Sequence, residues 1–552
     1  MTSDSGRVGT SCAPSRRVAA ITCGAILVLA FALRAWRIGW GLDRSLAFPD
    51  EPAFWQSYLY AFAPSSWQSP FGHSLFYPPL YGYLSGIAVA LGRWIGWIGP
   101  ERDLFAGLLV ARWVSVLASV ATVVVTGRTG ARIGGPGVGL LVAALTASIP
   151  LEAMQTHYAS CDPLLCLTIA LVCLASCAFT RDRDAWRAAG CGASVGLAFA
   201  TKYNAIVFGA APAWVVLEVA FAERSARRVL TLAGAVLAGF VVATVIACPP
   251  WLFETRRLLG QMRWINFMST VGNWLPANNH VSPDVGWYGS SPYLYRVFAS
   301  LPFALGWPLW IAAMSGVALA LWRRDASDRV LLAGAGAYFV LLGQTNVSFA
   351  RYVVPLLPVL AILAARLLHA LPLRREARVP LAAAIVAYGA ALGFSQVARF
   401  SYDQQVEVAR WIRERFPADA WPELSVVVPA HTASYFQLQE PLAREGLAQR
   451  NAKAEHWLDD RPEVFVLPEW YATAVRRDRA RAGQRVELDR LETGAAGYTE
   501  AARWSSRYLQ QDLYTRLDPA FASDLYMGAI GFRVYVRDDL VTRDRAPGAG
   551  PR

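Results

Sequence analysis

VLTLAGAVLAGFVVATVIAC, residues 229–248, is a run of twenty residues without a charged side chain. An α-helix needs about twenty predominantly apolar residues to cross the hydrocarbon core of a bilayer. Arg227 and Arg228 stand just before the run, and a pair of prolines follows it. The stretch therefore predicts a helix that spans a membrane and has arginines at one end.

Similar runs recur in the first part of the 552-residue chain, which is 55% hydrophobic and only 17% charged. Soluble domains usually carry about 25% charged residues. The runs lie at about 18–36, 105–127, 137–152, 163–179, 188–201, 204–221, 229–248, 297–321, 330–345, 352–369 and 379–397. They predict a polytopic α-helical membrane protein with eleven spans.

Short clusters of arginines follow every second run, and the positive-inside rule places such loops in the cytoplasm. They contain Arg128 and Arg132; Arg181, Arg183 and Arg187; Arg224, Arg227 and Arg228; Arg323, Arg324 and Arg329; and Arg374, Arg375 and Arg378. We therefore interpret the net charge of +12 as a topology signal and expect no nucleic-acid partner.

One further apolar stretch, 78–98, decides whether the number of spans is odd or even. The N-terminus carries Arg16 and Arg17 and is expected to be cytoplasmic like the arginine loops. These two assignments agree only if 78–98 does not cross the bilayer. Glycines interrupt this stretch and it is rich in Trp and Tyr, as expected of a helix that lies at the interface. If it crosses instead, the chain has twelve spans.

The C-terminal part has a different composition, which divides the chain into two predicted domains. Residues 1–399 form the transmembrane domain, with outside loops at 37–104 and 249–296. Residues 400–552 contain no spanning run and by parity lie outside the cell. DQQVEVARWIRERF (403–416) is typical of an amphipathic helix, and LSVVVPA (424–430), EVFVLPE (463–469) and FRVYVRDD (532–539) are typical of buried strands. We expect a small soluble α/β domain with a disordered tail after Thr542.

Two acids in the first outside loop are the first residues that could take part in a reaction. FPDEP places Asp50 and Glu51 between Pro49 and Pro52, and prolines restrict the conformation of such a segment. Neighbouring residues in extended chain point to opposite faces. We expect Asp50 to face a reaction centre and Glu51 to orient it. The alternative is a turn whose acids are simply solvated.

THYASCDPLL (156–165) forms the next outside turn and brings a third acid to the same side. Asp162 precedes Pro163, so it is either a helix N-cap or part of a site. His157 is either a hydrogen-bonding partner in that site or an ordinary interfacial residue.

Cations follow on the same side of the membrane. ATKYNA (200–205) places Lys202 in an apolar stretch, and FARYVVPLLP (349–358) places Arg351 at the mouth of a span. Lys202 either snorkels to the surface or binds an anion. Arg351 is suited to bidentate phosphate binding but equally to a lipid headgroup. Transfer of a sugar from a lipid phosphate needs cations that hold the phosphate. It also needs a carboxylate that accepts a proton.

The ordered set of these segments resembles the GT-C membrane glycosyltransferases of the dolichyl-phosphate-mannose protein mannosyltransferase type, including aminoarabinose transferases. The motifs that carry the resemblance are LRAWRIG leading into PDE, YPPLYGYL at 77–84, THYASCDPLL, GLAFATKYNA and RYVVPLLP. They cover most of residues 30–360. The resemblance implies a GT-C-like fold in a bacterial plasma (inner) membrane.

The resemblance also implies site roles. The acid that matches Asp50 is the catalytic base, Asp162 matches a second acid that helps shape the site, and Lys202 and Arg351 match positions suited to the donor phosphate. With Glu51, which is expected to orient Asp50, these acids form the predicted catalytic set. Tyr77 is the third residue that we predict at the donor phosphate. It stands where many relatives have Lys or His, so phosphate binding rests more on Lys202 and Arg351, or the donor differs. The remaining substrate-binding residues that we predict are His157, Tyr203, His280 and Tyr352.

The expected reaction is transfer of a hexose or pentose from a polyprenyl-phosphate donor to a hydroxyl on the outer face, with inversion and base assistance. The acceptor would be a glycolipid, a polysaccharide or a protein, as in lipopolysaccharide biosynthesis or protein glycosylation. The aromatic loop 249–296 would cover it, unless its Trp and Tyr residues are ordinary interfacial ones. No cofactor is required, and two acids are too few to argue for a divalent metal. The alternatives are a glycan ligase with a diphosphate donor and a transporter or flippase.

Overall fold

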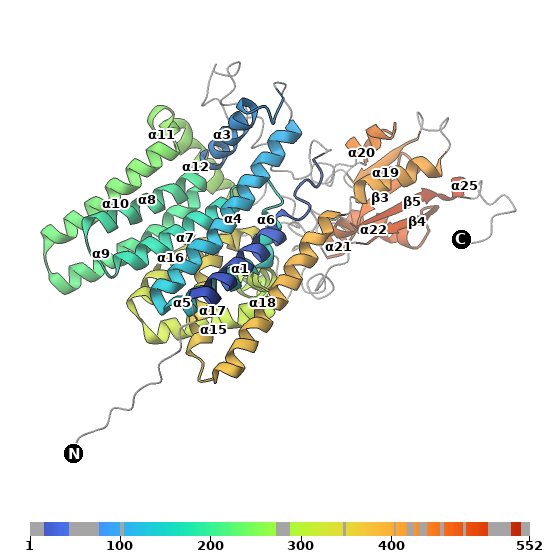
Figure 1. Ribbon diagram of the computed structural model, residues 1–552. Coiled ribbons are helices and arrows are strands. Elements are labelled where there is room, and N and C mark those ends of the chain that lie inside the picture. Colours follow the sequence, from blue (N-terminus) through green and yellow to red (C-terminus); the bar gives the residue numbers. More distant parts are fainter. Residues whose placement is uncertain are drawn as a thin grey trace.

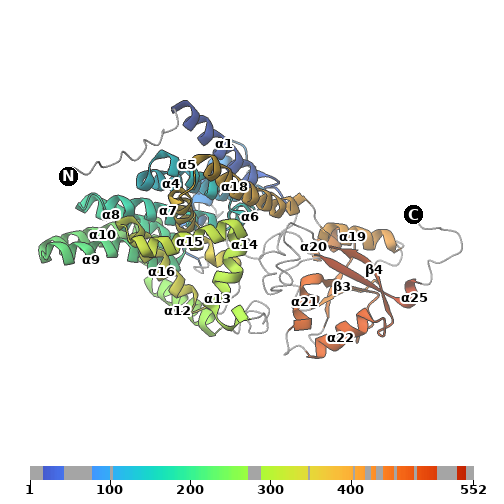
Figure 2. The same cartoon turned by 90° about the horizontal axis from the view of Figure 1, so that it is seen from below.

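The computed structural model describes residues 16–42, 77–99, 104–271, 287–345, 349–401, 404–416, 424–429, 439–452, 457–477, 482–505 and 531–541. Its first four hundred or so residues form a bundle of helices, and a small domain with a sheet lies beside one end of α18 (Figures 1 and 2). The predicted site residues Asp50, Glu51 and His280 and the predicted disordered tail lie outside the described residues.

Most elements of the bundle coincide with the predicted apolar runs. The helices are α1 (Arg16–Ala35), α3 (Leu80–Trp94), α4 (Leu104–Gly134), α5 (Pro136–Ala147), α6 (Pro150–Gln155), α7 (Asp162–Phe179), α8 (Ala185–Thr201), η2 (Tyr203–Gly209), α9 (Ala210–Glu223), α10 (Ala226–Ala247), α11 (Pro250–Phe253), α12 (Thr255–Val271), η5 (Trp287–Ser290), α13 (Pro292–Tyr295), η6 (Arg296–Ser300), α14 (Leu301–Leu305), α15 (Trp307–Arg323), α16 (Ala326–Leu342), η7 (Ala350–Leu356), α17 (Leu357–Ala370), α18 (Arg375–Ala398) and η8 (Arg399–Ser401).

Seven helices in the described part of the chain are long and apolar enough to cross a membrane. They comprise Arg16–Ala35, Phe105–Gly134, Asp162–Phe179, Tyr203–Glu223, Ala226–Ala247, Ala350–Ala370 and α18, which is the apolar part of Arg375–Arg415. The protein is therefore a multi-pass α-helical membrane protein, as predicted. The total of eleven spans stays a prediction.

Two predicted spans are divided in the structure. The run 297–321 contains η6, α14 and α15, and the chain breaks at Gly306, where φ is +75°. Such a φ suits glycine, and Pro302 and the proline after Trp307 fix the first turns on either side. The run 137–152 ends its helix at Ala147, and Pro150 opens the short α6.

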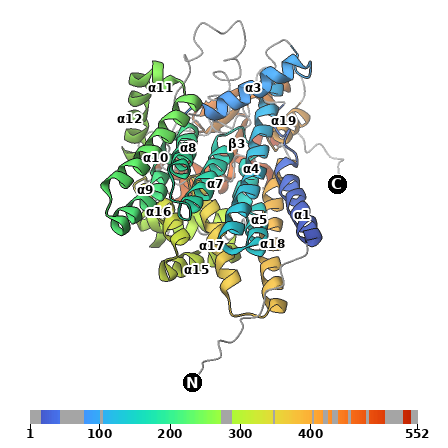
Figure 3. The same ribbon diagram turned by 60° about the vertical axis from the view of Figure 1, so that its left-hand side comes forward.

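Helix α3 lies across the end of the bundle instead of alongside its neighbours (Figure 3). Its 15 residues rise about 22 Å, which is less than the roughly 30 Å of a hydrocarbon core. Trp94 and Trp97 are 84% and 86% exposed, whereas Gly82, Gly86 and Gly92 are buried. Of the two tryptophans, Trp94 ends α3 and Trp97 follows it, and the interfacial position of this helix stays a prediction.

Helices α8 and α10 pack so closely that their glycines cannot carry a side chain. A Cβ on Gly192 would lie 1.8 Å from the carbonyl oxygen of Val236, and one on Gly239 would lie 2.0 Å from that of Ala189. Small residues allow membrane helices to approach in this way. Because Lys202 caps the end of α8, this contact also sets the position of that side chain.

We expect Gly192→Val to force α8 and α10 apart and to lower the melting temperature of the purified protein. Overpacking of this kind costs about 1–3 kcal/mol or more. Gly234→Val on α10 is the control, because a Cβ there meets nothing within 4 Å. Thermal unfolding in detergent measures both variants. Equal melting temperatures for the two would contradict the close-packing account.

The C-terminal domain contains a five-stranded sheet in the order β2-β1-β3-β5-β4. Strand β1 is parallel to β2 and β3, and β5 is antiparallel to β3 and β4. The elements are α19 (Gln404–Arg415), β1 (Val426–Pro429), α20 (Gln439–Arg444), β2 (Gln449–Ala452), β3 (Val464–Pro468), α21 (Glu469–Arg477), α22 (Ala482–Glu492), β4 (Tyr498–Trp504), β5 (Phe532–Arg537) and α25 (Asp538–Val541).

The three predicted strands and the predicted helix are confirmed as β1, β3, β5 and α19. Strands β2 and β4 were not predicted. They are the two edges of the sheet, with the sequences QRNA and YTEAARW. Edge strands do not need the continuous apolar run that marks β1 and β3, whose residues are all buried.

Candidate active site

An ion pair joins two of the predicted site residues. Lys202 Nζ lies 2.8 Å from Asp162 Oδ1, and their side chains are only 12% and 5% exposed. Asp162 is the first residue of α7, where an acid is favoured by the helix dipole, and Lys202 is the C-terminal cap of α8. Cys161 occupies the N-cap position of α7, without a side-chain capping bond. Lys202 is thus largely buried and paired, and Asp162 binds it instead of capping the helix.

This ion pair keeps Lys202 charged. Burial is the largest single effect and lowers the pKa of the Lys202 ammonium, but the Asp162 carboxylate together with Cys161, Tyr77 and Tyr338 holds that pKa well above its usual value. A buried ion pair of this kind is costly to break from one side, because the remaining charge is left without compensation.

Two tyrosines flank the Lys202 ammonium. Nζ lies 5.7 Å from the ring centre of Tyr77 and 5.4 Å from that of Tyr352. Both distances are within the range of cation–π attraction. The segment before α3 and the turn η7, which are far apart in the sequence, thus meet at the end of α8. The ring of Tyr77 thus lies beside the ammonium of Lys202.

Arg296 adds a second buried cation, which the sequence analysis did not select. Its guanidinium carbon lies 5.7 Å from the ring centre of Tyr352, the same ring that lies beside the Lys202 ammonium. Its NH1 group donates to the carbonyl oxygen of Phe349 at 3.0 Å. Arg296 is 0% exposed. A lone arginine at the end of an aromatic loop carried no sequence signal that distinguished it from other loop arginines.

Tyr338 and Asn204 complete the group. Tyr338 Oη donates to the carbonyl oxygen of Tyr352 at 3.0 Å, and Asn204 Nδ2 donates to Tyr338 Oη at 3.4 Å. These bonds tie α16 and η2 to the turn that carries Tyr352. We call the residues that meet here the Lys202 cluster: Tyr77, Asp162, Lys202, Asn204, Arg296, Tyr338 and Tyr352.

The other predicted site residues have different surroundings. Arg351 is 6% exposed, and its guanidinium carbon lies 4.0 Å from the ring centre of Phe349. Neighbours in a tight helical turn project in different directions, so Tyr352 contacts Lys202 whereas Arg351 packs on Phe349. The ring of Tyr203 packs against that of Phe199, with ring centres 5.6 Å apart.

His157 is fully buried between two backbone carbonyls. Its Nε2 lies 2.6 Å from the oxygen of Trp36 and its Nδ1 lies 3.0 Å from that of Ala153. Its ring stacks on Phe400, with centres 4.5 Å apart. These contacts favour a positioning role over direct contact with a substrate.

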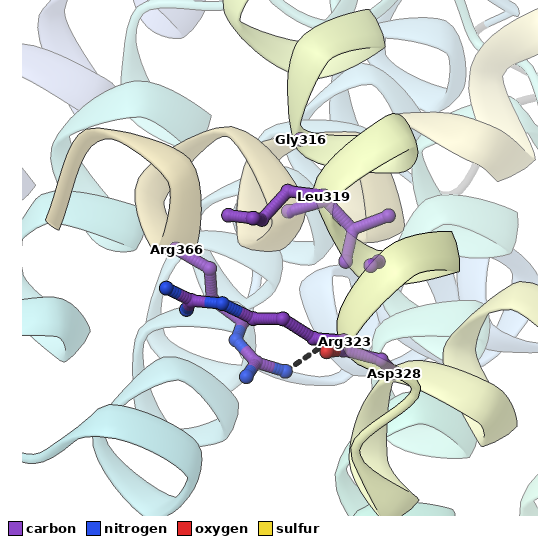
Figure 4. A pocket seen from close by; sticks show the side chains of 7 residues that line it. Gly316, Leu319, Arg323, Asp328 and Arg366 are labelled. Carbon is purple, nitrogen blue, oxygen red and sulfur yellow. Dashed lines mark hydrogen bonds and ion pairs between the residues drawn. The ribbon is translucent and has the colours of Figure 1, made fainter. Parts of the chain in front are cut away.

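The opposite end of the bundle carries a separate ionic group. Arg366 binds Asp328 and also Asp325, the latter at 2.6 Å, beside a small hollow lined by Gly316 and Arg323 (Figure 4). Tyr352 and Arg366 are separated by roughly 20 Å of helix. The hollow and its arginines therefore do not belong to the Lys202 cluster, and the arginine-bearing ends of α8, α16 and α17 lie away from it.

Within the residues that the structure describes, no group of three or more His, Cys, Asp or Glu side chains could hold a metal ion. The acid pair of FPDEP is outside that part of the chain.

Comparison with known proteins gives one family. Residues 91–253 match the family described as dolichyl-phosphate-mannose-protein mannosyltransferase. This segment includes Asp162 and Lys202 of the cluster. No curated protein matches the chain by sequence.

Several solved structures have a similar course of the chain. ArnT from Cupriavidus metallidurans in the apo state shares 15% identity, covers 97% of this chain and 99% of its own, and has a TM-score of 0.49. The Archaeoglobus fulgidus oligosaccharyltransferase in the apo form shares 13% identity, covers 84% of this chain and 71% of its own, and has a TM-score of 0.47. The Saccharomyces cerevisiae protein O-mannosyltransferase Pmt1-Pmt2 complex shares 16% identity, covers 50% of this chain and 37% of its own, and has a TM-score of 0.33. At these TM-scores the likenesses carry no argument about function. The family match confirms the predicted resemblance of this chain to the GT-C membrane glycosyltransferases, over residues 91–253.

Proposed function

We propose that this protein transfers a monosaccharide, a hexose or a pentose, from a polyprenyl-phosphate donor to an acceptor hydroxyl on the outer face of the bacterial plasma membrane. The observation that carries the proposal is the Lys202 cluster, in which two cations, the largely buried Lys202 and the fully buried Arg296, flank the ring of Tyr352. Buried cations are suited to a phosphate group that gains charge as the sugar leaves it.

The position of the cluster supports a reaction on the outer face. Lys202 follows the last residue of α8, whereas Arg183 and Arg187 lie at the other end of that helix. In the same way Tyr338 and Tyr352 lie at the ends of α16 and η7–α17 that are remote from Arg329 and Arg366. If the arginine loops are cytoplasmic, as the positive-inside rule predicts, the cluster lies outside.

In the proposed reaction, the acceptor oxygen attacks the anomeric carbon from the face opposite the phosphate. A bond forms between them, the bond from the anomeric carbon to the phosphate oxygen breaks, and the configuration inverts. The bonding electron pair leaves with the polyprenyl phosphate. Asp50 accepts the proton of the acceptor hydroxyl, an assistance worth about 10²–10⁴-fold in rate. No metal or other cofactor enters these steps.

Lys202 and Arg296 would stabilise the charge on the departing phosphate. Asp162 would hold the Lys202 ammonium in place through the 2.8 Å ion pair. The rings of Tyr77 and Tyr352 restrict the same ammonium from two sides. A preorganised cation needs no rearrangement during the reaction, which is why its contribution is large. Arg351 stays a proposed phosphate ligand on the resemblance, and the acceptor remains a glycolipid, a polysaccharide or a protein.

The experiment is binding of polyprenyl monophosphate to the purified protein, followed by native mass spectrometry in detergent. We expect wild type to form a one-to-one complex with polyprenyl monophosphate. The affinity of Lys202→Met for the same lipid should be at least tenfold lower. Tighter binding of polyprenyl diphosphate than of monophosphate would favour the glycan ligase. Uptake of sugar lipid by proteoliposomes without any sugar transfer would favour the transporter.

Arg296→Lys is expected to weaken monophosphate binding about tenfold, because lysine retains the charge but loses the planar fork of donors. Arg34→Lys is the matched control. Arg34 is also 0% exposed, and its guanidinium bonds the carbonyl oxygens of Ala147 and Thr146 at 2.9 and 3.2 Å, away from the cluster. Titration of both variants with polyprenyl phosphate checks the expectation. Equal affinities for the two variants would remove Arg296 from the phosphate site.

A further inference from the structure

The chain that leaves α10 forms two further helices, α11 and α12, at the same end of the bundle as α3 (Figure 3). Helix α10 is long and apolar enough to cross a membrane, and only 11% of its most apolar part is buried inside the protein. Ile246, near its end, is 73% exposed, and in α11 Leu252 and Phe253 are 61% and 70% exposed. Large apolar side chains that stay exposed beside the end of a membrane span are suited to lipid.

Helix α12 turns one face toward the bundle. Leu258 is 0% exposed and packs against Phe199 and Tyr203. These two rings stand three positions before and one position after Lys202. The start of α12 is therefore fixed against the end of α8, beside the residues that adjoin the Lys202 cluster.

The face of α12 that points away from the bundle is charged. Arg256 and Arg263 are seven positions apart, which places them on one side of a helix and about 10 Å apart along its axis. Both are exposed, and Leu259 between them is 42% exposed. Helix α12 contains no acid, and within the described part of the chain neither arginine forms an ion pair. The neighbouring Arg257 is bonded to Glu254 at 2.9 Å.

The positive-inside rule does not account for these arginines. Helix α12 lies at the end of α10 that is remote from Arg227 and Arg228, in the predicted outside loop 249–296. On that side arginines do not fix the orientation of a span. Two cations beside exposed apolar side chains require a partner with a negative group on an apolar body. A phospholipid with an anionic headgroup has both parts.

We infer that α11 and the start of α12 form a docking surface for anionic phospholipids of the adjoining leaflet. Leu252 and Phe253 enter the acyl region of that leaflet. Arg256 and Arg263 bind the phosphates of its headgroups, on either side of Leu259. We call these five residues the α12 lipid surface. The inference does not depend on the proposed function, because none of the five belongs to the Lys202 cluster.

The test is hydrogen exchange of the full-length protein in nanodiscs of phosphatidylglycerol, compared with nanodiscs of phosphatidylcholine. A basic side chain near an anionic membrane surface contributes about a fivefold gain in affinity, so two contribute roughly 25-fold. Backbone amides at residues 255–263 should therefore exchange at least fivefold more slowly in phosphatidylglycerol. The amide of Leu258, which donates to the carbonyl oxygen of Glu254 at 3.0 Å, is a suitable probe.

Arg256→Gln combined with Arg263→Gln should abolish the difference between the two lipids. Arg410→Gln combined with Arg450→Gln is the matched control, because it removes two exposed arginines from the C-terminal domain. The control should keep the full difference. Equal exchange of the wild type in both lipids, or a difference that survives in the α12 double variant, overturns the inference.

A second measurement separates phospholipid from the sugar donor, which also carries a phosphate. The α12 double variant should bind polyprenyl monophosphate within twofold of the wild type in native mass spectrometry, and Lys202→Met should keep the lipid-dependent exchange. If the α12 double variant loses monophosphate binding as Lys202→Met is expected to, its arginines serve the donor and the inference falls. If wild type binds no polyprenyl monophosphate, the proposed function fails, while the exchange result still decides the α12 lipid surface.

Discussion

Lys202→Met is expected to reduce sugar transfer by about 10²–10³-fold, the usual effect of removing one preorganised charge from a reaction centre. The same change leaves Asp162 buried, at 5% side-chain exposure, without its partner. Breaking a buried pair from one side costs about 3–5 kcal/mol, so the melting temperature of the protein should also fall. Transfer per folded protein and thermal unfolding measure the two effects separately.

The double variant Lys202→Met with Asp162→Asn separates chemistry from stability. Removing both charges takes away the unpaired carboxylate, so most of the lost stability should return. Transfer should stay low, because the phosphate still lacks its cation. A double variant that regains transfer together with stability would show that the pair is only a structural ion pair.

Asp50→Asn is expected to lower kcat by about 10²–10⁴-fold, the contribution of general-base assistance. Asparagine has nearly the same shape as aspartate but cannot accept the proton, so donor binding should be unchanged. Single-turnover transfer and polyprenyl phosphate binding, measured on the same preparation, check both parts of this expectation.

Glu51→Gln is the control for Asp50→Asn, because it alters the neighbouring acid of the same FPDEP segment. Its loss should be smaller, since Glu51 is proposed only to orient the base. If Glu51→Gln costs more than Asp50→Asn, the two acids exchange roles. Normal transfer by Asp50→Asn would remove Asp50 from the reaction.

The membrane architecture could be predicted because long apolar runs and arginine loops are local signals. Runs such as 229–248 need no tertiary information to be identified. The break at Gly306 was not predicted, because hydropathy averages over the prolines and the glycine that divide the run. Strands β2 and β4 were missed because edge strands are not marked by burial.

The candidate site could be predicted in part. Asp162 and Lys202 were selected singly, as an acid before a proline and as a cation in an apolar stretch, but their pairing depends on how α7 and α8 pack. Arg296 was missed because its importance comes from the ring of Tyr352, which lies 56 positions later in the chain.

The most direct test of the account is transfer of radiolabelled sugar from a panel of polyprenyl-monophosphate sugars, in membranes that hold wild type, Asp50→Asn or Lys202→Met. The account predicts that label from at least one donor reaches an acceptor with the wild type, and that both variants, present at comparable folded levels, lose nearly all of it. Transfer by the variants at the wild-type rate, or no transfer from any monophosphate donor by folded wild type, would contradict it.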